Sequence, residues 1–218
     1  MIKIIYEDNH LLVVEKPINI PVQEDSSKDE DLLNMLKKYI KEKYNKPGNV
    51  YLGLVHRLDR PVGGIMVFAK TSKCASRLSE QVRDRSLNKT YYAVVIGNID
   101  EKGILTDKLL KDEKNNIVRI DENGKEAVLE FEKVKFKDNM SLIKINLKTG
   151  RSHQIRVQLL NYGFPLYGDQ KYNSNAKAGE QLALFSKSLS FYHPVSKELL
   201  MFECALPDRY PFSIFKKE

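Results

Sequence analysis

The segment from His56 to Gly64 contains residues that are able to position a nucleophile. It reads His-Arg-Leu-Asp-Arg-Pro-Val-Gly-Gly, so an arginine stands close on each side of Asp59. Pro61 disfavours a helical conformation of the residue before it, and the two glycines permit a tight turn. We therefore expect Asp59 on a rigid loop, ionised at neutral pH because cations flank it. An ionised carboxylate suits a nucleophile better than a general acid, but a loop-stabilising ion pair explains the same residues.

A second polar segment, residues 148–156, precedes an apolar stretch. Ser152 is placed to cap a helix over residues 153–162, which is followed by a glycine. The free N–H groups and the dipole of a helix N-terminus favour anions. The segment is thus able to hold a phosphate or orient a carboxylate. The alternative is an ordinary capped helix with Gln154 and Arg156 exposed.

The third segment contains two adjacent tyrosines, Tyr91 and Tyr92, shortly after Lys89. Neighbouring residues of a strand point to opposite faces, so only one of the two rings is needed in a core. The other is available to stack on a nucleic-acid base, a contact worth about 1–3 kcal/mol per base. For an isolated tyrosine, packing in the core is the simpler interpretation.

The charge balance favours a polyanionic partner. Lys and Arg number 36 against 29 Asp and Glu, which gives a net charge of +7. Residues 51–100 alone contain 8 basic and 4 acidic residues, a net +4. Such an excess releases counterions from phosphates on binding, although a lysine-rich surface also serves solubility. The basic residues near the predicted helix 72–84 are Lys70, Lys73, Arg77, Arg83, Arg85 and Lys89.

Composition excludes several other classes of protein. The 218 residues contain no apolar run of the roughly 20 residues that a membrane-spanning helix needs. The first residues turn acidic too early for a signal peptide, so we expect a cytoplasmic protein without a membrane partner. The four histidines and two cysteines form no metal motif, and no glycine-rich phosphate loop precedes a helix. We expect no metal, no cofactor and a monomer.

The elements predicted to position these residues include both strands and helices. Strands are predicted at 4–6, 11–14, 51–55, 64–69, 91–96 and 142–147. Short strands and turns are predicted over 102–137, with Asn115-Asn116 and Asn123-Gly124 as the turn signals. A polar loop at 23–31 precedes a helix from residue 32 to about 43, for which Asp29 is the predicted N-cap. No repeat or linker separates these elements. We predict one α+β domain over residues 1–218.

Taken together, these segments resemble the RluA-type family of RNA pseudouridine synthases. The resemblance runs in the family's order from about Ile4 to Pro207. Its main segments are 7–17, His56-Arg57-Leu58-Asp59, Lys89-Thr90-Tyr91-Tyr92-Ala93, Thr149-Gly150-Arg151-Ser152-His153-Gln154-Ile155-Arg156 and 163–169. The resemblance implies the pseudouridine synthase fold, a mixed and mainly antiparallel sheet with flanking helices.

The resemblance also implies an activity and residue roles. The activity is an isomerase reaction that converts a uridine of structured ribosomal or transfer RNA to pseudouridine, with the base flipped out of its stack. Asp59 is implied as the catalytic aspartate, Tyr91 as the residue that stacks on uracil, and Arg156 as the partner of Asp59. Arg57 is implied to fill the gap left by the flipped nucleotide. Further RNA contacts are expected from His56, Arg60, Lys73, Arg77, Lys89, Arg151 and Gln154.

Departures and alternatives accompany this hypothesis. Where the family loop often reads Asp-Thr-Ser-Gly, this chain has Arg60-Pro61-Val62-Gly63-Gly64, which aligns with it only in part and lacks two hydroxyls near Asp59. Many relatives carry a small N-terminal RNA-binding domain, which we do not expect here. A catalytically silent RNA-binding or ribosome-assembly factor on the same fold is the alternative function. A kinase is disfavoured because its glycine-rich loop and metal-binding motifs do not occur.

Overall fold

The computed structural model describes residues 2–216. They form two compact units, residues 2–89 with 186–204 and residues 90–185 with 205–216. Each unit is built on antiparallel strand pairs with at least one helix, so the predicted α+β class and mainly antiparallel sheet are confirmed. The prediction of a single domain over residues 1–218 stays a prediction.

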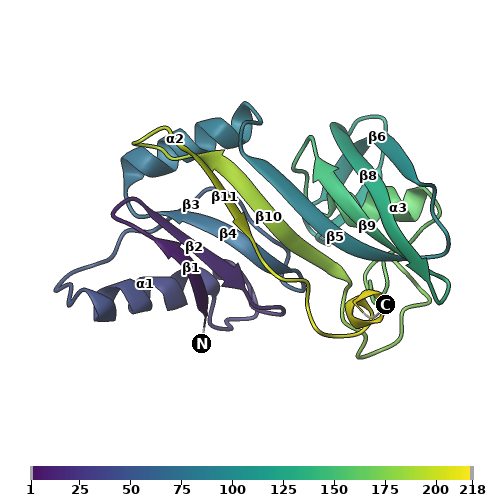
Figure 1. Cartoon of the computed structure of the whole chain (residues 1–218), viewed down its shortest axis with the longest axis horizontal. Helices are drawn as coiled ribbons and strands as arrows, with labels where there is room; N and C mark the ends of the chain where they lie inside the picture. Colours follow the sequence, from purple (N-terminus) through teal and green to yellow (C-terminus); the bar gives the residue numbers. More distant parts are fainter. Residues whose placement is uncertain (1, 217–218) are drawn as a thin grey trace. The chain divides into compact units, whose positions relative to one another are not determined.

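In the first unit the strands follow the order β1-β2-β4-β10, with β3 paired to β4 and β11 to β10 (Figure 1). The bounds are Lys3–Glu7 for β1, Leu11–Lys16 for β2, Gly53–Leu54 for β3, Gly63–Ala69 for β4, Leu184–Tyr192 for β10 and Leu199–Glu203 for β11. Every residue of β4 is buried, as are the first four of β2. These two strands are therefore the centre of the core, which explains why both read as continuous apolar runs rather than alternating ones.

Two helices complete the first unit, α1 over Leu32–Lys43 and α2 over Ser72–Arg83. The side chain of Asp31, not the predicted Asp29, caps α1 by accepting the N–H of Asn34 at 3.0 Å. Asp31 stands directly before the first helical residue, where a cap must be, so the position predicted for the cap was two residues early. Asp29 is exposed and pairs instead with Arg60.

The second unit has the strand order β5-β9-β8-β6-β7, and all four neighbouring pairs are antiparallel. The bounds are Asn88–Ile96 for β5, Lys102–Asp112 for β6, Ile117–Ile120 for β7, Lys125–Lys137 for β8 and Met140–Leu147 for β9. The predicted turns at Asn115-Asn116 and Asn123-Gly124 are confirmed. The short strands predicted between 102 and 137 are wrong, because β6 and β8 are 11 and 13 residues long and pair along most of their length.

Helix α3, Gln154–Asn161, belongs to the second unit. It begins one residue later than predicted. Its N-cap is His153 in the left-handed conformation (φ 50°), and the predicted cap Ser152 does not fill that position. Residues Gln154 to Leu159 are all buried, so the helix lies inside the unit rather than on its surface. A short 3-10 helix, Phe212–Phe215, lies near the C-terminus.

No helix in residues 2–216 is long and apolar enough to cross a membrane. Within the same residues, His, Cys, Asp and Glu side chains form no group of three or more that is able to hold a metal ion.

Candidate active site

Asp59 lies in a short loop of the first unit between β3 and β4. Its carbonyl accepts the N–H of Val62 at 2.9 Å, which closes a tight turn. Leu58 and Val62 are buried beside it, with 7% and 2% exposure, while Asp59 itself is half-buried. The loop is thus anchored by apolar side chains, and Asp59 within it stays partly accessible.

Gly64 anchors the end of this loop by a close backbone contact. It has φ +120°, and a Cβ atom at this position would lie 2.2 Å from the carbonyl oxygen of Ser186. Both the conformation and the spacing demand glycine. Gly64 therefore marks where β4 passes against β10.

Lys16, to which the sequence analysis assigned no role of its own, holds the Asp59 loop. Its side chain is buried (1% exposed). The ammonium group donates hydrogen bonds to the backbone carbonyls of Pro17, Arg60 and Val62 at 3.0, 3.0 and 2.7 Å. Burial lowers the pKa of Lys16 to about 7, although the nearby Asp59 carboxylate acts in the opposite direction. The only sequence signal for this role is a lysine that ends an apolar run.

His56 lies in the interior of the first unit and stands three residues before Asp59 in the chain. It is 8% exposed, and its Nε2 accepts the N–H of Val67 at 3.2 Å. Burial, and to a smaller extent the charge of Lys89, lowers the pKa of His56 to about 3. The ring is therefore neutral at physiological pH. Its burial favours a structural role over the predicted contact with RNA.

Other cations predicted to contact RNA in the first unit are more accessible than His56. Arg57 is exposed. Lys89 is half-buried, and burial lowers its pKa. Neither has an ion-pair partner among residues 2–216. Arg60 is paired with acids of the polar loop 23–31.

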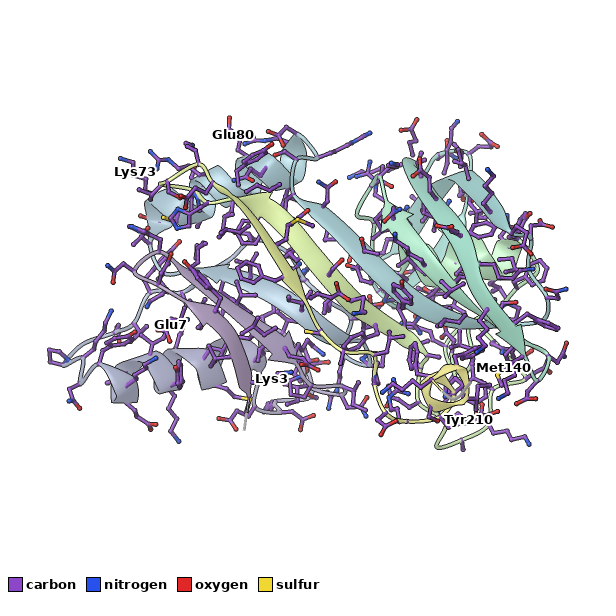
Figure 2. All side chains as sticks on the ribbon, in the orientation of Figure 1. Lys3, Glu7, Lys73, Glu80, Met140 and Tyr210 are labelled. Atoms are coloured by element: carbon purple, nitrogen blue, oxygen red, sulfur yellow. The ribbon has the colours of Figure 1, made fainter. Side chains whose placement is uncertain are left out.

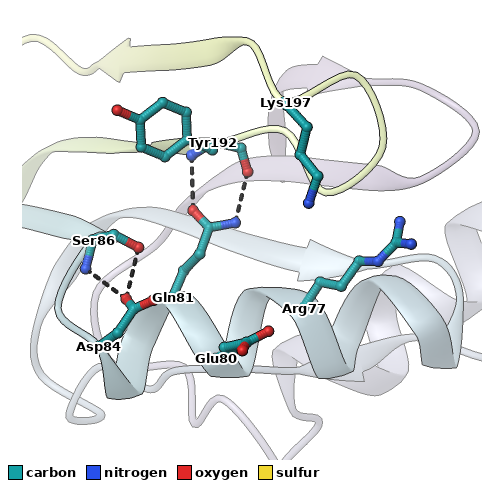
Figure 3. Close-up of a pocket in the computed structure, with 7 residues that line it drawn as sticks. All are labelled: Arg77, Glu80, Gln81, Asp84, Ser86, Tyr192 and Lys197. Carbon is teal, nitrogen blue, oxygen red and sulfur yellow. Dashed lines mark hydrogen bonds between the residues drawn. The ribbon is translucent and has the colours of Figure 1, made fainter.

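Helix α2 presents a mixed charged surface. Lys73 and Glu80 point outward from it (Figure 2). Arg77 donates to the carbonyl of Pro194 at 2.7 Å and lines a shallow pocket beside the β10–β11 connection (Figure 3). In the same pocket Gln81 exchanges two 2.8 Å hydrogen bonds with the backbone of Tyr192. The amide thereby pairs with the edge of β10 as a neighbouring strand would.

In the second unit, Arg156 has a partner that the sequence analysis missed. Its Nε and Nη2 donate to the two carboxylate oxygens of Asp169 at 2.9 and 2.6 Å, and both side chains are buried. The guanidinium also lies over the ring of Tyr172, 5.0 Å from its centroid. Such a two-point pair fixes the plane of an arginine. A guanidinium has five N–H donors, so this pair is compatible with the predicted pairing to Asp59.

Gln154 organises the start of α3. It is 2% exposed. Its amide oxygen accepts from Thr149 at 2.8 Å and from the N–H of Arg151 at 3.0 Å, and its nitrogen donates to Val128 and Gln158. An amide has two donors and an oxygen with two lone pairs, so all of its capacity is used within the protein. The structure favours a structural role over the predicted RNA contact.

Tyr91 and Arg151 complete the predicted set in the second unit. Tyr91 is buried on β5 (6% exposed), opposite Ile145 of β9. Arg151 is exposed, and its Nε donates to the carbonyl of Glu126 at 2.9 Å. Asp59 belongs to the first unit, and Tyr91 and Arg156 belong to the second. Their predicted convergence on one uracil therefore stays a prediction.

Comparison with known proteins gives consistent matches. The family model described as RNA pseudouridylate synthase matches residues 10–161. Ribosomal large subunit pseudouridine synthase D of Zymomonas mobilis is 34% identical over 94% of this chain and 69% of its own length. Ribosomal large subunit pseudouridine synthase C of Buchnera aphidicola is 36% identical over 93% of this chain and 66% of its own length. The chain thus spans about two thirds of the length of these relatives.

The fold is also that of solved structures. The structure of human RNA Pseudouridylate Synthase Domain Containing 4 superposes with a TM-score of 0.80 and 22% identity, covering 97% of this chain and 90% of that one. The predicted fold and family are confirmed.

Proposed function

Since this chain belongs to the RNA pseudouridylate synthase family, we propose that it converts a uridine of ribosomal RNA to pseudouridine. The match over residues 10–161 carries the proposal, because it includes Asp59, Tyr91 and Arg156. The choice of ribosomal RNA over transfer RNA follows the names of the relatives, which are ribosomal large subunit enzymes.

The reaction is an isomerisation that needs no net oxidation or reduction. The bond between N1 of uracil and C1′ of the ribose breaks, the uracil turns, and a bond between C5 and C1′ forms. The proton on C5 is then lost, and N1 gains one. The chain must therefore supply an anionic group at the reacting centre, a pocket that retains the detached base and a proton acceptor.

Asp59 is proposed as the anionic group. Two features of the first unit support this role: the loop is pinned by Lys16, and Asp59 is only half-buried. A rigid loop holds the carboxylate in one geometry, and a rate depends steeply on such positioning. Tyr91 is proposed to stack on the uracil and to assist the late proton removal. Arg156, oriented by Asp169, is proposed to hold the Asp59 carboxylate.

RNA binding is proposed to use the cations without acidic partners. Arg57, which is exposed and stands two residues before Asp59, is proposed to enter the gap left by the flipped nucleotide. Flipping costs a few kcal/mol, and an inserted side chain offsets part of that cost. Lys73, Arg77 and Lys89 are proposed to contact phosphates.

The test is pseudouridine formation on unmodified ribosomal RNA by the purified chain and by the Asp59→Asn variant. This substitution keeps the size of the side chain and removes its charge. We expect the variant to lose activity by at least about a thousandfold. Asp138→Asn is the matched control, because Asp138 is exposed and distant in sequence.

Two outcomes would count against the proposal, and one further experiment would identify the modified position. Full activity of Asp59→Asn would contradict the assigned nucleophile. RNA binding without pseudouridine formation by the wild type would favour the silent RNA-binding factor. Mapping pseudouridine in cells with and without the gene identifies the modified position.

A further inference from the structure

An acidic segment covers the arginine that follows Asp59. Residues 23–31, here called the acidic strap, contain five acidic residues and one lysine, so their net charge is 1 − 5 = −4, in a chain of net charge +7. Residues 23–30 are all exposed. Backbone hydrogen bonds from Leu32 to Pro21 (2.9 Å) and from Leu33 to Val22 (3.1 Å) close the base of the strap. A strongly anionic loop therefore lies where a polyanionic substrate has to approach.

The strap binds Arg60 through three oxygen-bearing side chains. Asp29 accepts a hydrogen bond from Nη2, Ser27 accepts one from Nη1 at 2.9 Å, and a carboxylate oxygen of Asp25 lies 3.8 Å from Nη1. Ser27 also donates to Asp25 at 2.6 Å, which keeps the group together. The guanidinium thus contacts two carboxylates and a hydroxyl. These are anionic and polar oxygen acceptors, the same kind of partner that a phosphodiester offers to an arginine.

The side-chain contacts of Arg60 are weak enough to be replaced by others, whereas its backbone carbonyl is held firmly in place. The side chains of Arg60, Asp25 and Asp29 are 41%, 40% and 53% exposed. Ion pairs that are this exposed to water contribute only about 0–1 kcal/mol each. The carbonyl of Arg60, in contrast, is held by the buried Lys16 at 3.0 Å. The guanidinium is therefore able to change partners without disturbing the Asp59 loop.

We propose that Arg60 is a binding site for a phosphate of the RNA backbone next to the target uridine, and that the acidic strap occupies this site until RNA displaces it. The acidic strap thus competes with RNA for the Arg60 side chain of the same molecule. It lowers the affinity for any short polyanion and yields to an RNA whose remaining contacts are correct. This inference rests on the proposed function, because it takes RNA to approach Asp59.

The test measures affinity for a fluorescently labelled, unmodified stem-loop RNA with uridines in its loop. The variants are Asp29→Asn, Arg60→Gln and the double variant. Glu30→Gln is the matched control, because it makes the same change of charge in the same strap at an exposed residue without a hydrogen-bond or ion-pair partner in the described chain. Circular dichroism and thermal midpoints establish that each variant is folded.

We expect Asp29→Asn to bind RNA about two- to fivefold more tightly than the wild type at 0.1 M salt, the effect of losing one exposed ion pair. Glu30→Gln acts only through screened long-range charge and changes affinity less. Arg60→Gln weakens binding and lowers the slope of log affinity against log salt by about 0.7–0.9, which corresponds to one lost phosphate contact. In the Arg60→Gln background, Asp29→Asn gives no gain beyond that of Glu30→Gln.

Equal effects of Asp29→Asn and Glu30→Gln would overturn the proposal, as would a gain from Asp29→Asn that persists without Arg60. Failure of the proposed function would give a different combination of results from failure of the strap proposal. If the wild type makes no pseudouridine but the coupling between positions 29 and 60 is present, the phosphate site stands and the isomerase does not. If pseudouridine forms without that coupling, only the strap is refuted.

Discussion

Replacing Lys16 by methionine removes the side-chain nitrogen that donates hydrogen bonds to the Asp59 loop. Three buried or half-buried carbonyls lose their donor. An unsatisfied buried acceptor costs about 1–3 kcal/mol. The expected net loss is on the order of 2–4 kcal/mol at pH 8. A loop that shifts by about 1 Å would also reduce catalysis by about a hundredfold.

The pH dependence of this loss separates the role of the charge from simple packing. Burial lowers the pKa of Lys16 from 10.5 to about 7 in the folded chain. Between these values the unfolded chain binds more protons than the folded one, so the contribution of Lys16 to stability rises with pH. The slope approaches 1.36 kcal/mol per pH unit. The gap between wild type and Lys16→Met is therefore expected to widen by about 2 kcal/mol from pH 7.5 to 9.5.

Urea unfolding of both proteins, followed by circular dichroism at pH 7.5, 8.5 and 9.5, measures this gap. Lys38→Met is the control, since Lys38 is exposed on α1; its gap from the wild type is expected to stay constant. A constant gap for Lys16→Met as well would refute the buried, proton-poor state of this lysine. If the difference in stability between wild type and Lys16→Met narrows as the pH rises, the folded chain binds more protons at Lys16 than the unfolded chain, which is the opposite of the expectation.

Two further substitutions test the first unit. Burial alone would raise the pKa of Glu7, but hydrogen bonds from Lys43, Lys70 and two tyrosines outweigh it and lower the pKa from 4.5 to about 2. The resulting stability, on the order of 3 kcal/mol, is present above pH 4.5 and lost as the pH falls toward 2. Thermal midpoints of wild type and Glu7→Gln should thus converge between pH 6 and pH 3, and a pH-independent difference would contradict this. Gly64→Ala places a Cβ 2.2 Å from a backbone oxygen and is expected to cost about 3 kcal/mol or more in urea unfolding. Gly48→Ala, where nothing lies within 4 Å of the Cβ, is its control, and equal stability of the two variants would show that β4 and β10 are able to separate.

The sequence predicted those features that depend on neighbours along the chain. The apolar runs of β2 and β4, the helical spacing of α1 and α2, and the turns at Asn115-Asn116 and Asn123-Gly124 all follow from local periodicity or turn chemistry. The long pairing of β6 with β8 did not, because charged residues on the exposed face interrupt the apolar pattern.

In the candidate site, too, some features followed from the sequence and others did not. Ordered segments of residue types identified the family and the position of Asp59 in the chain. They did not reveal that Lys16 reaches carbonyls 44 and 46 residues away, that Asp169 orients Arg156, or that Gln154 is saturated by the protein.

Local sequence was therefore sufficient for most of the elements and for the identity of the reactive segments, since these depend on residues close together in the chain. It was not sufficient for the length of β6 and β8, which depends on pairing between strands. The partners of the buried polar groups depended on tertiary structure. A lysine, glutamine or arginine at the end of a strand or the start of a helix is compatible with solvent, with RNA or with the protein interior. Only folding brings distant carbonyls and carboxylates within hydrogen-bonding distance, and the cost of leaving a buried charge unpaired then selects those partners.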